Sequence, residues 1–346
     1  MPINIPDGLP AISALESENI FVMSESRAQS QDIRPMKIAV LNLMPTKIET
    51  EIQFMRLLSN TPLQVDVTLV VPSTHESKNT SKDYLARFYK RFSEIEDENF
   101  DGMIVTGAPL ENKDFEQVDY WDEMRRIMDW TKDHVTTTVY VCWAALAGLN
   151  YLYGVGKVMF PSKKSGIFQY RNLMHSDPLM RGLDDIIRMP QSRYATVDKD
   201  DLLKNPHLHV AAVDYEGDPG IVMSDGGEIF ITGHLEYDVN TLAYEYQRDT
   251  DRGLDPNVPT AYFPEDDPRF DPVLTWRSYA TLIFSNWLNY YVYQLTPYDL
   301  KDVRKRRRAI CHCLRLNVQH WTLDETMVPF FHSLISIGFS SFTYSR

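Results

Sequence analysis

Cysteine is scarce in this sequence, and its scarcity narrows the class of protein. The 346 residues include three cysteines, Cys142, Cys311 and Cys313, which are too few for a disulfide framework. No run of about 18 apolar residues is present, so the sequence predicts no membrane-spanning helix. The N-terminal residues MPINIPDGLPAI have neither the basic start nor the apolar stretch of a signal peptide. We therefore expect a cytoplasmic protein with no membrane partner.

Basic residues are also fewer than acidic ones. The chain carries 35 Lys and Arg against 48 Asp and Glu, a formal net charge of −13. Nucleic-acid binding requires a basic face, so this balance argues against it. The imbalance is uneven: residues 301–346 hold eight Lys or Arg and three Asp or Glu, a net +5, and the first 300 residues carry −18. This contrast marks a boundary near residue 300.

The chain is predicted to have three parts. Residues 1–35 are polar and expected to be an irregular segment, and residues 36–300 are expected to form one α/β domain. Residues 301–346 form a basic tail whose composition resembles nothing before it. A non-native extension, for example from a shifted reading frame, would explain that difference.

The tail contains two motifs that leave alternatives open. The run RKRRR at residues 304–308 is typical of a solvated charge cluster, with a nuclear or nucleic-acid signal as the alternative. Cys311 and Cys313, with His320 and His332, raise the question of zinc. The one-residue cysteine spacing is not the usual zinc-finger pattern, and no second cysteine pair exists. We therefore expect no metal site.

Short apolar segments alternate with amphipathic ones in the first half of the chain. The predicted strands are KIAVLNL (37–43), LQVDVTLV (63–70), FDGMIVTG (100–107) and TTTVYVC (136–142). The predicted helices are ETEIQFMRLL (49–58), WDEMRRIMDWTKDH (121–134) and WAALAGLNYLYG (143–154), the last closed by Gly154. This alternation implies a parallel sheet with right-handed crossovers, whose site lies at the carboxyl ends of the strands.

The second half of the chain is less regular. Short strands are predicted at residues 207–213, 220–224 and 228–233. Helices are predicted near residues 241–253 and 275–295. No internal repeat is evident.

Cys142 stands where the fourth predicted strand ends and a helix begins. A lone cysteine is more often a small buried apolar residue. A side chain on such a turn, however, is presented to solvent, and the helix N-terminus favours its thiolate. The backbone N–H of Trp143 points to the same place, and Gly107 lets a second backbone donor approach, so both are predicted to bind an oxyanion. Cys142 is therefore a candidate nucleophile.

A cysteine nucleophile needs a base, and the segment after the strand EIFIT offers one. Gly233 lets the chain turn so that the imidazole of His234 reaches across the sheet edge. Glu236, two positions later, is placed to orient the ring and stabilise the imidazolium. A histidine taken alone is more often a surface residue, but its pairing with Cys142 at a strand end favours catalysis.

Several long motifs resemble the homoserine O-succinyl/O-acetyltransferase family. They are NLMPTK (42–47), TGAP (106–109), VDYW (118–121), VCWAA (141–145), SRY (192–194), TGHLEYD (232–238) and FSNWLNYYVYQLTPY (284–298). The resemblance covers roughly residues 1–299. It implies a flavodoxin-like core similar to class I glutamine amidotransferases. It also implies a triad of Cys142, His234 and Glu236 that works through an acyl thioester on the cysteine.

Further site residues are implied by the same resemblance. Lys47 matches an active-site lysine, with a surface lysine at a helix start as the alternative. Glu245 and Arg248 match a pair that holds the ammonium and the carboxylate of an amino acid, with a surface i, i+3 salt bridge as the alternative. Lys163 and Ser192 match the acyl-donor pocket.

Two positions depart from the family pattern, and a third residue indicates which acyl donor is used. Leu146 replaces a Gln that commonly follows the nucleophile, and Gln191 replaces a His before Ser192 and Arg193, which puts details of the acyl pocket in doubt. Glu111 follows the TGAPL loop, and Glu at the matching position resembles the acetyl-using members. The resemblance therefore implies acetyl-CoA as donor, unless Glu111 merely faces water.

The sequence therefore predicts a homoserine O-acetyltransferase of methionine biosynthesis, with Arg193 beside Ser192 among the substrate-binding residues. Its partners would be L-homoserine and an acyl-CoA co-substrate, with no bound cofactor. A homodimer is compatible with this assignment, although the sequence does not set the oligomeric state. The alternatives are an O-succinyltransferase, a glutamine amidotransferase-like amidase and a catalytically silent binding protein.

Overall fold

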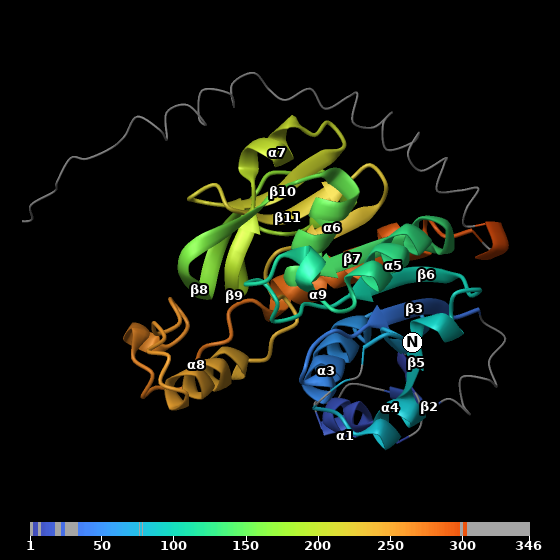
Figure 1. Cartoon of the computed structure of the whole chain (residues 1–346), viewed down its shortest axis with the longest axis horizontal. Coiled ribbons are helices and arrows are strands. Elements are labelled where there is room, and N and C mark those ends of the chain that lie inside the picture. The colour runs from blue at the N-terminus through green and yellow to red at the C-terminus, as the bar shows by residue number, and fades with distance from the viewer. Residues whose placement is uncertain are drawn as a thin grey trace, which may run out of the picture.

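The computed structural model describes residues 3–5, 8–17, 22–24, 34–75, 77, 79–297 and 300–302. The tail motifs, including Cys311, Cys313 and the basic run, lie outside these residues. The described strands form one sheet of order β2-β1-β4-β3-β6-β7-β12-β11-β10-β8-β9, with β5 paired to β4 (Figure 1). Its centre consists of β4 (Val65–Val71), β3 (Met36–Leu41), β6 (Phe100–Val105), β7 (Val135–Val141) and β12 (Glu228–Ile231).

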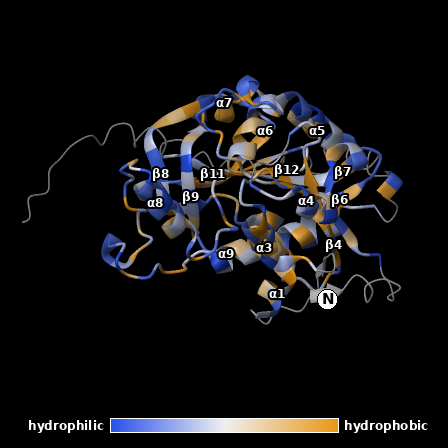
Figure 2. Ribbon diagram, turned by 60° about the horizontal axis from the view of Figure 1, so that its bottom comes forward, coloured by the Kyte–Doolittle hydropathy of each residue, from blue (hydrophilic) through white to orange (hydrophobic). Residues whose placement is uncertain are grey.

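These five central strands are parallel, as predicted from the alternation of strands and helices. Beyond β12 the sheet becomes antiparallel. The antiparallel strands are β11 (Pro219–Ser224), β10 (Leu208–Asp214), β8 (Lys157–Asn172) and β9 (Ile186–Val197). The long strands β8 and β9 were not predicted. Figure 2 shows that both mix hydrophilic and hydrophobic residues, so neither presents the apolar run of a buried strand.

Alternate residues of each central strand face opposite layers of the molecule. Ile38 and Val40 of β3 pack into one core cluster, which includes residues of α1 (Pro10–Ser17), α3 (Lys47–Leu58) and α9 (Arg277–Asn286). Ala39 and Leu41 pack into a second cluster with α5 (Trp121–His134) and α6 (Trp143–Tyr153). The sheet is therefore sandwiched between helices, as Figure 1 shows.

The helix predictions differ from the structure in two places. Helix α1 has Ala11 and Leu15 buried, so the N-terminal segment is not irregular over these residues. The helix expected over residues 275–295 changes after α9 into a π-helical segment, η5 (Trp287–Tyr293). Helix α8 (Thr241–Asp251) forms as predicted and projects to one side of the domain in Figure 1.

The remaining elements are short. They are β1 (Ile3–Ile5), β2 (Val22–Ser24), β5 (Tyr89–Arg91), α4 (Lys82–Phe88), α7 (Lys199–Lys204) and the one-turn helices η1 (Phe92–Glu94), η2 (Phe115–Gln117), η3 (Pro178–Met180), η4 (Pro264–Asp266) and η6 (Leu300–Asp302).

Candidate active site

Cys142 occupies a sharp turn between β7 and α6, as predicted. Its backbone has φ 51° and ψ −116°, a left-handed conformation that a non-glycine residue adopts at a cost of about 1–3 kcal/mol. The Cys142 N–H donates to the carbonyl of Ile231, at 2.7 Å, which ties the turn to the end of β12. The thiol is almost completely buried, so the expectation that this turn presents it to solvent is wrong. Strained turns of this kind aim a nucleophile at the carboxyl edge of the sheet.

His234 and Glu236 follow β12 and reach the same edge. In the register of β7 and β12, Val141 lies opposite Ile231, so the residues that follow the two strands emerge side by side. The Nδ1 atom of His234 lies 2.7 Å from Oε1 of Glu236. The backbone N–H of His234 donates to the carbonyl of Pro190, at 2.9 Å. Glu236 thus holds the imidazole, and Pro190 holds the backbone that carries it.

The Cys142 thiol and the His234 imidazole affect each other's pKa. Burial raises the pKa of the Cys142 thiol, and the adjacent His234 opposes this shift. Burial by itself would lower the pKa of His234, but Cys142 and Glu236 outweigh it and raise that pKa well above its usual value. A positively charged imidazole beside the sulfur favours the thiolate, which is the reactive form.

Gly107 and Trp143 supply the backbone around the thiol. A Cβ atom added at Gly107 would lie 3.1 Å from the Cβ of Cys142 and 3.3 Å from Cε1 of His234. The lack of a side chain therefore lets this backbone approach both catalytic groups. Trp143 is completely buried, and its backbone N–H is the first of α6, so it has no partner within the helix. Donation from these two residues to an oxyanion stays a prediction.

Glu111 borders the nucleophile rather than facing water. Its Oε1 atom lies 3.7 Å from Sγ of Cys142, and its side chain is buried. Burial raises the pKa of Glu111 above its ordinary value. The ammonium of Lys157 bonds to the backbone carbonyl of Glu111, at 2.9 Å, and so fixes the loop. The alternative of a solvent-exposed loop residue is wrong.

Glu245, Lys163 and Ser192 come together from three different elements. Glu245 lies on α8, Lys163 on β8 and Ser192 on β9. The Nζ atom of Lys163 lies 3.2 Å from Oε2 of Glu245, and the hydroxyl of Ser192 donates to the same oxygen. Burial would raise the pKa of Glu245, but Lys163 and the hydrogen bonds from Ser192 and Tyr237 hold it below its usual value. Glu245 is therefore an anion at neutral pH.

Arg193 is placed differently from the expectation, whereas for Arg248 only the alternative is contradicted. Arg248 is half exposed and pairs with Asp249, at 2.8 Å. In the described part of the chain no ion pair joins Arg248 to Glu245, so the i, i+3 salt-bridge alternative is wrong. Arg193 is completely buried, and its guanidinium bonds to Asp218, to Gln191 and to the carbonyl of Ala195. This burial does not support a direct contact between Arg193 and substrate; the residue belongs to an internal network.

Lys47 is a buried residue at the start of α3, so the surface-lysine alternative is wrong. Its Nζ atom donates to the carbonyls of Asn42, at 2.8 Å, and Met44, at 3.3 Å. Burial lowers the pKa of Lys47 to about 8, against an opposing effect of Glu51. The ammonium therefore holds the loop that follows β3.

Two residues near the site were not predicted from the sequence to belong to it. Tyr237 stacks on His234, and its hydroxyl bonds to Glu245. The side chain of Gln191, noted only as a departure, packs against Gly233: a Cβ atom there would lie 2.4 Å from Nε2 of Gln191. Tyr237 lies within the motif TGHLEYD, and its distance of three positions from His234 was the available signal.

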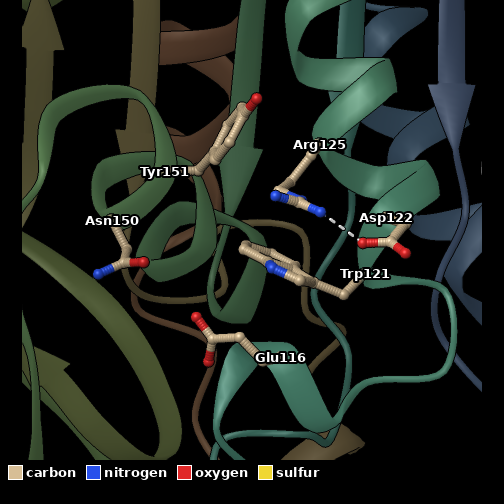
Figure 3. Close-up of a pocket in the computed structure, with 6 residues that line it drawn as sticks. All are labelled: Glu116, Trp121, Asp122, Arg125, Asn150 and Tyr151. Carbon is tan, nitrogen blue, oxygen red and sulfur yellow. Dashed lines mark hydrogen bonds and ion pairs between the residues drawn. The ribbon is translucent and has the colours of Figure 1, made fainter.

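A separate surface pocket lies near the other end of α6 (Figure 3). It has a volume of about 300 Å³ and is lined by Glu116, Trp121, Asp122, Arg125, Asn150 and Tyr151. Its charged groups are engaged in part, since Arg125 pairs with Asp122. None of the predicted site residues lines it, so this pocket is distinct from the Cys142 site.

Two further properties concern ligands and membranes. Among the residues that the structure describes, no group of three or more His, Cys, Asp or Glu side chains is arranged to hold a metal ion. No described helix has both the length and the apolar character to cross a membrane.

The fold has a counterpart among solved structures. A glutamine amidotransferase from Thermotoga maritima matches with a TM-score of 0.51 and 10% identity, covering 76% of this chain and 100% of that chain. At this identity the likeness concerns the fold alone. Together with the mostly parallel central sheet, this likeness gives the chain a glutamine amidotransferase-like α/β fold, which confirms the predicted fold class.

Within that class, the sequence identifies one family. The model described as homoserine O-succinyltransferase matches residues 2–298, and the chain belongs to this family. A relative named homoserine O-acetyltransferase from Methanomethylophilus alvi is 57% identical over 306 residues, covering 88% of this chain and 99% of the relative. One of the same name from Lachnospira eligens is 53% identical, covering 87% and 98%. A homoserine O-succinyltransferase from Shewanella baltica is 52% identical, covering 88% and 97%. These matches confirm the family resemblance.

Proposed function

We propose that this protein transfers an acetyl group from acetyl-CoA to the hydroxyl of L-homoserine, a step of methionine biosynthesis. The observation that carries the choice of acetyl is the buried carboxyl of Glu111, 3.7 Å from the Cys142 sulfur. The family and the names of relatives at 57% and 53% identity support homoserine as acceptor.

The first half-reaction loads the enzyme. The Cys142 thiolate attacks the carbonyl carbon of acetyl-CoA, and a carbon–sulfur bond forms. The backbone N–H groups at Trp143 and Gly107 stabilise the oxyanion of the tetrahedral intermediate. When the intermediate collapses, the bond to the CoA sulfur breaks, and the CoA thiolate takes a proton from His234. The acetyl group remains on Cys142 as a thioester.

The second half-reaction discharges the enzyme. The hydroxyl oxygen of homoserine attacks the thioester carbonyl while His234 accepts the hydroxyl proton. Collapse breaks the bond to Cys142, which leaves as the thiolate, and O-acetyl-L-homoserine is released. Glu245 provides the negative charge for the homoserine ammonium, and Arg248, whose guanidinium is half exposed, provides the positive charge for its carboxylate.

Several accompanying properties belong to the same proposal. The enzyme works in the cytoplasm and requires no bound cofactor, because its thiol, imidazole and backbone donors are sufficient for acyl transfer. Residues 36–300 form the acyltransferase domain, and residues 301–346 are dispensable. A homodimer is compatible with this chemistry but is not required by it, since the proposed catalytic residues belong to one chain.

Succinyl transfer is the second candidate, because a relative at 52% identity carries that name. A succinyl group is longer and ends in a carboxylate, which would lie beside Glu111 once the acyl group is bound to Cys142. The closeness of Glu111 to the sulfur therefore favours the shorter, uncharged acetyl group.

The test is the intact mass of the protein after mixing with acetyl-CoA, succinyl-CoA or glutamine, each with and without homoserine. We expect an acetyl adduct with acetyl-CoA that disappears when homoserine is added. Cys142→Ala, which removes the sulfur but leaves the turn, should form no adduct. A stable succinyl adduct in place of the acetyl adduct would favour the second candidate, and glutamine hydrolysis would indicate an amidase.

A further inference from the structure

Tyr237 covers one face of the His234 ring. The two ring centroids lie 4.1 Å apart with an angle of 17° between the planes, so the rings are stacked. Both side chains are buried, at 5% and 3% exposure. The hydrogen bond with Glu236 holds the Nδ1 edge of the imidazole but still allows the ring to tilt out of its plane. The stacked Tyr237 ring restricts this tilt. The position of the base therefore depends on Tyr237 as well as on Glu236.

The other end of Tyr237 reaches the carboxylate that is proposed to hold the homoserine ammonium. The Tyr237 hydroxyl donates to Oε1 of Glu245, at 2.8 Å, while Lys163 and Ser192 engage Oε2. Tyr237 is thus the hydrogen-bond donor to one of the two carboxylate oxygens of Glu245. Burial and the neighbouring carboxylate of Glu245 raise the pKa of Tyr237 well above its ordinary value, so the phenol remains a donor at neutral pH.

The backbone of Tyr237 is fixed as well. Its carbonyl accepts a hydrogen bond from the indole N–H of Trp276, at 3.0 Å, and its N–H donates to the carbonyl of His234, at 3.3 Å. Trp276 is completely buried in a small apolar cluster that includes Tyr237 and Tyr262. Because its backbone is held on both sides, the side chain forms a rigid link between imidazole and carboxylate.

We propose that Tyr237 is a positioning residue with two separable roles: its ring aligns His234, and its hydroxyl aligns Glu245 for the acceptor. This inference rests on the proposed function, because it assigns the second half-reaction to homoserine. The ring aligns the base for both half-reactions, whereas the hydroxyl serves only the second, in which the acceptor binds.

Two substitutions separate the ring from the hydroxyl. Tyr237→Phe keeps the stack but removes the donor to Glu245. The rate of Cys142 acetylation should therefore stay within about twofold of the wild-type rate. KM for homoserine should rise about tenfold, which is a typical loss for one hydrogen bond to a charged group. Tyr237→Leu removes both contacts, and acetylation itself should slow about tenfold or more. Tyr262→Phe is the matched control, because Tyr262 lies in the same cluster and its hydroxyl bonds, among the described residues, only to backbone groups, of Val239 and Ala243, and not to Glu245.

The effect on His234 has a readout that needs no substrate. The rate at which iodoacetamide alkylates Cys142, followed by mass of its peptide across pH, reports the pairing of thiolate and imidazolium. Tyr237→Leu should shift the midpoint of this profile, and Tyr237→Phe and Tyr262→Phe should not. An unshifted Tyr237→Leu profile would overturn the role of the ring. An unchanged homoserine KM in Tyr237→Phe, or an equal rise in Tyr262→Phe, would overturn the role of the hydroxyl. Failure of the wild-type protein to form or discharge an acetyl adduct would instead reject the proposed function, and the alkylation profile would still decide the role of the ring.

Discussion

The Oε1 atom of Glu111 lies 3.7 Å from the Sγ atom of Cys142, so a buried carboxyl group borders the sulfur that would carry the acyl group. Two effects follow from this relationship. The side chain fills space that a longer acyl group needs, and its charge repels a second carboxylate. Like charges at about 4 Å repel by roughly 1–4 kcal/mol, which corresponds to about 5- to 1000-fold discrimination. Because burial raises the pKa of Glu111, the charge effect should strengthen as pH increases.

Glu111→Gly should therefore raise the use of succinyl-CoA relative to acetyl-CoA. The measurement is the ratio of kcat/KM for the two donors, and we expect it to shift by at least about tenfold toward succinyl-CoA. Glu111→Gln is the matched control, because it keeps the volume and removes the charge. An intermediate ratio in Glu111→Gln would divide the effect between space and charge. A donor ratio that is the same in wild-type and Glu111→Gly protein would count against the role of this residue.

The pairing of His234 with Glu236 predicts a graded loss of activity. His234→Ala removes the base and should lower kcat/KM by at least about 10³-fold. Glu236→Gln keeps a side chain of the same shape but removes the negative charge, so kcat should fall by about 10²- to 10⁴-fold. The same change should lower the pKa of His234, which NMR titration of the imidazole would detect. A fully active Glu236→Gln variant would reduce Glu236 to a structural residue.

The triad was predictable because its signals are local. A β-branched run ends at Cys142 and an Ala- and Leu-rich helix begins at once, and the EIFIT strand runs directly into His234. Parallel strands end at one edge of the sheet, so the two residues had to meet there. Glu236 follows at a short fixed spacing. The one long-range requirement is the pairing of β12 with β7.

The rest of the site depends on pairing that the local sequence does not reveal. Strand β8 contains Pro161 and Gly166, and its first half is largely exposed, so it lacks both the apolar run and the strict alternation of a strand. Its register with β9, in which Lys164 lies opposite Arg193, brings Lys163 and Ser192 to Glu245. The motif match named these residues but not their contacts. The stack of Tyr237 on His234 likewise requires three-dimensional geometry.

Removal of the tail should leave acyl transfer nearly unchanged. The family match ends at residue 298, and the basic composition begins after residue 300. A chain that ends after Leu300 should retain its kcat/KM within about twofold, because it keeps all of the proposed site residues. The steady-state assay should be accompanied by circular dichroism to verify folding. A truncated protein that folds but does not turn over would show that the tail contributes to the site.

Lys47 predicts an unusual dependence of stability on pH. Burial lowers its pKa from 10.5 to about 8 in the folded protein. The unfolded chain therefore binds more protons than the folded one between these two values, so the free energy of unfolding should rise with pH across this window. The stability gained when Lys47 is neutral is fully present above the pKa of Lys47 in the unfolded chain. It is lost as pH falls through about 8, the pKa of Lys47 in the folded protein. At 1.36 kcal/mol per pKa unit, the full effect is about 3 kcal/mol.

Lys47→Met keeps the aliphatic length and removes the titrating amine, so it should abolish this rise. Denaturant unfolding of both proteins at several pH values between about 7.5 and 10.5 gives the comparison, and the difference between the two curves isolates Lys47 from other alkaline titrations. The stability of Lys47→Met relative to wild type should be highest at the lower end of this range, where the buried ammonium is charged, and should decrease as pH rises. Loss of the contacts to Asn42 and Met44 adds a constant cost, which shifts the difference without changing its slope. A difference that is flat across the window would mean that Lys47 titrates alike in the folded and unfolded chains.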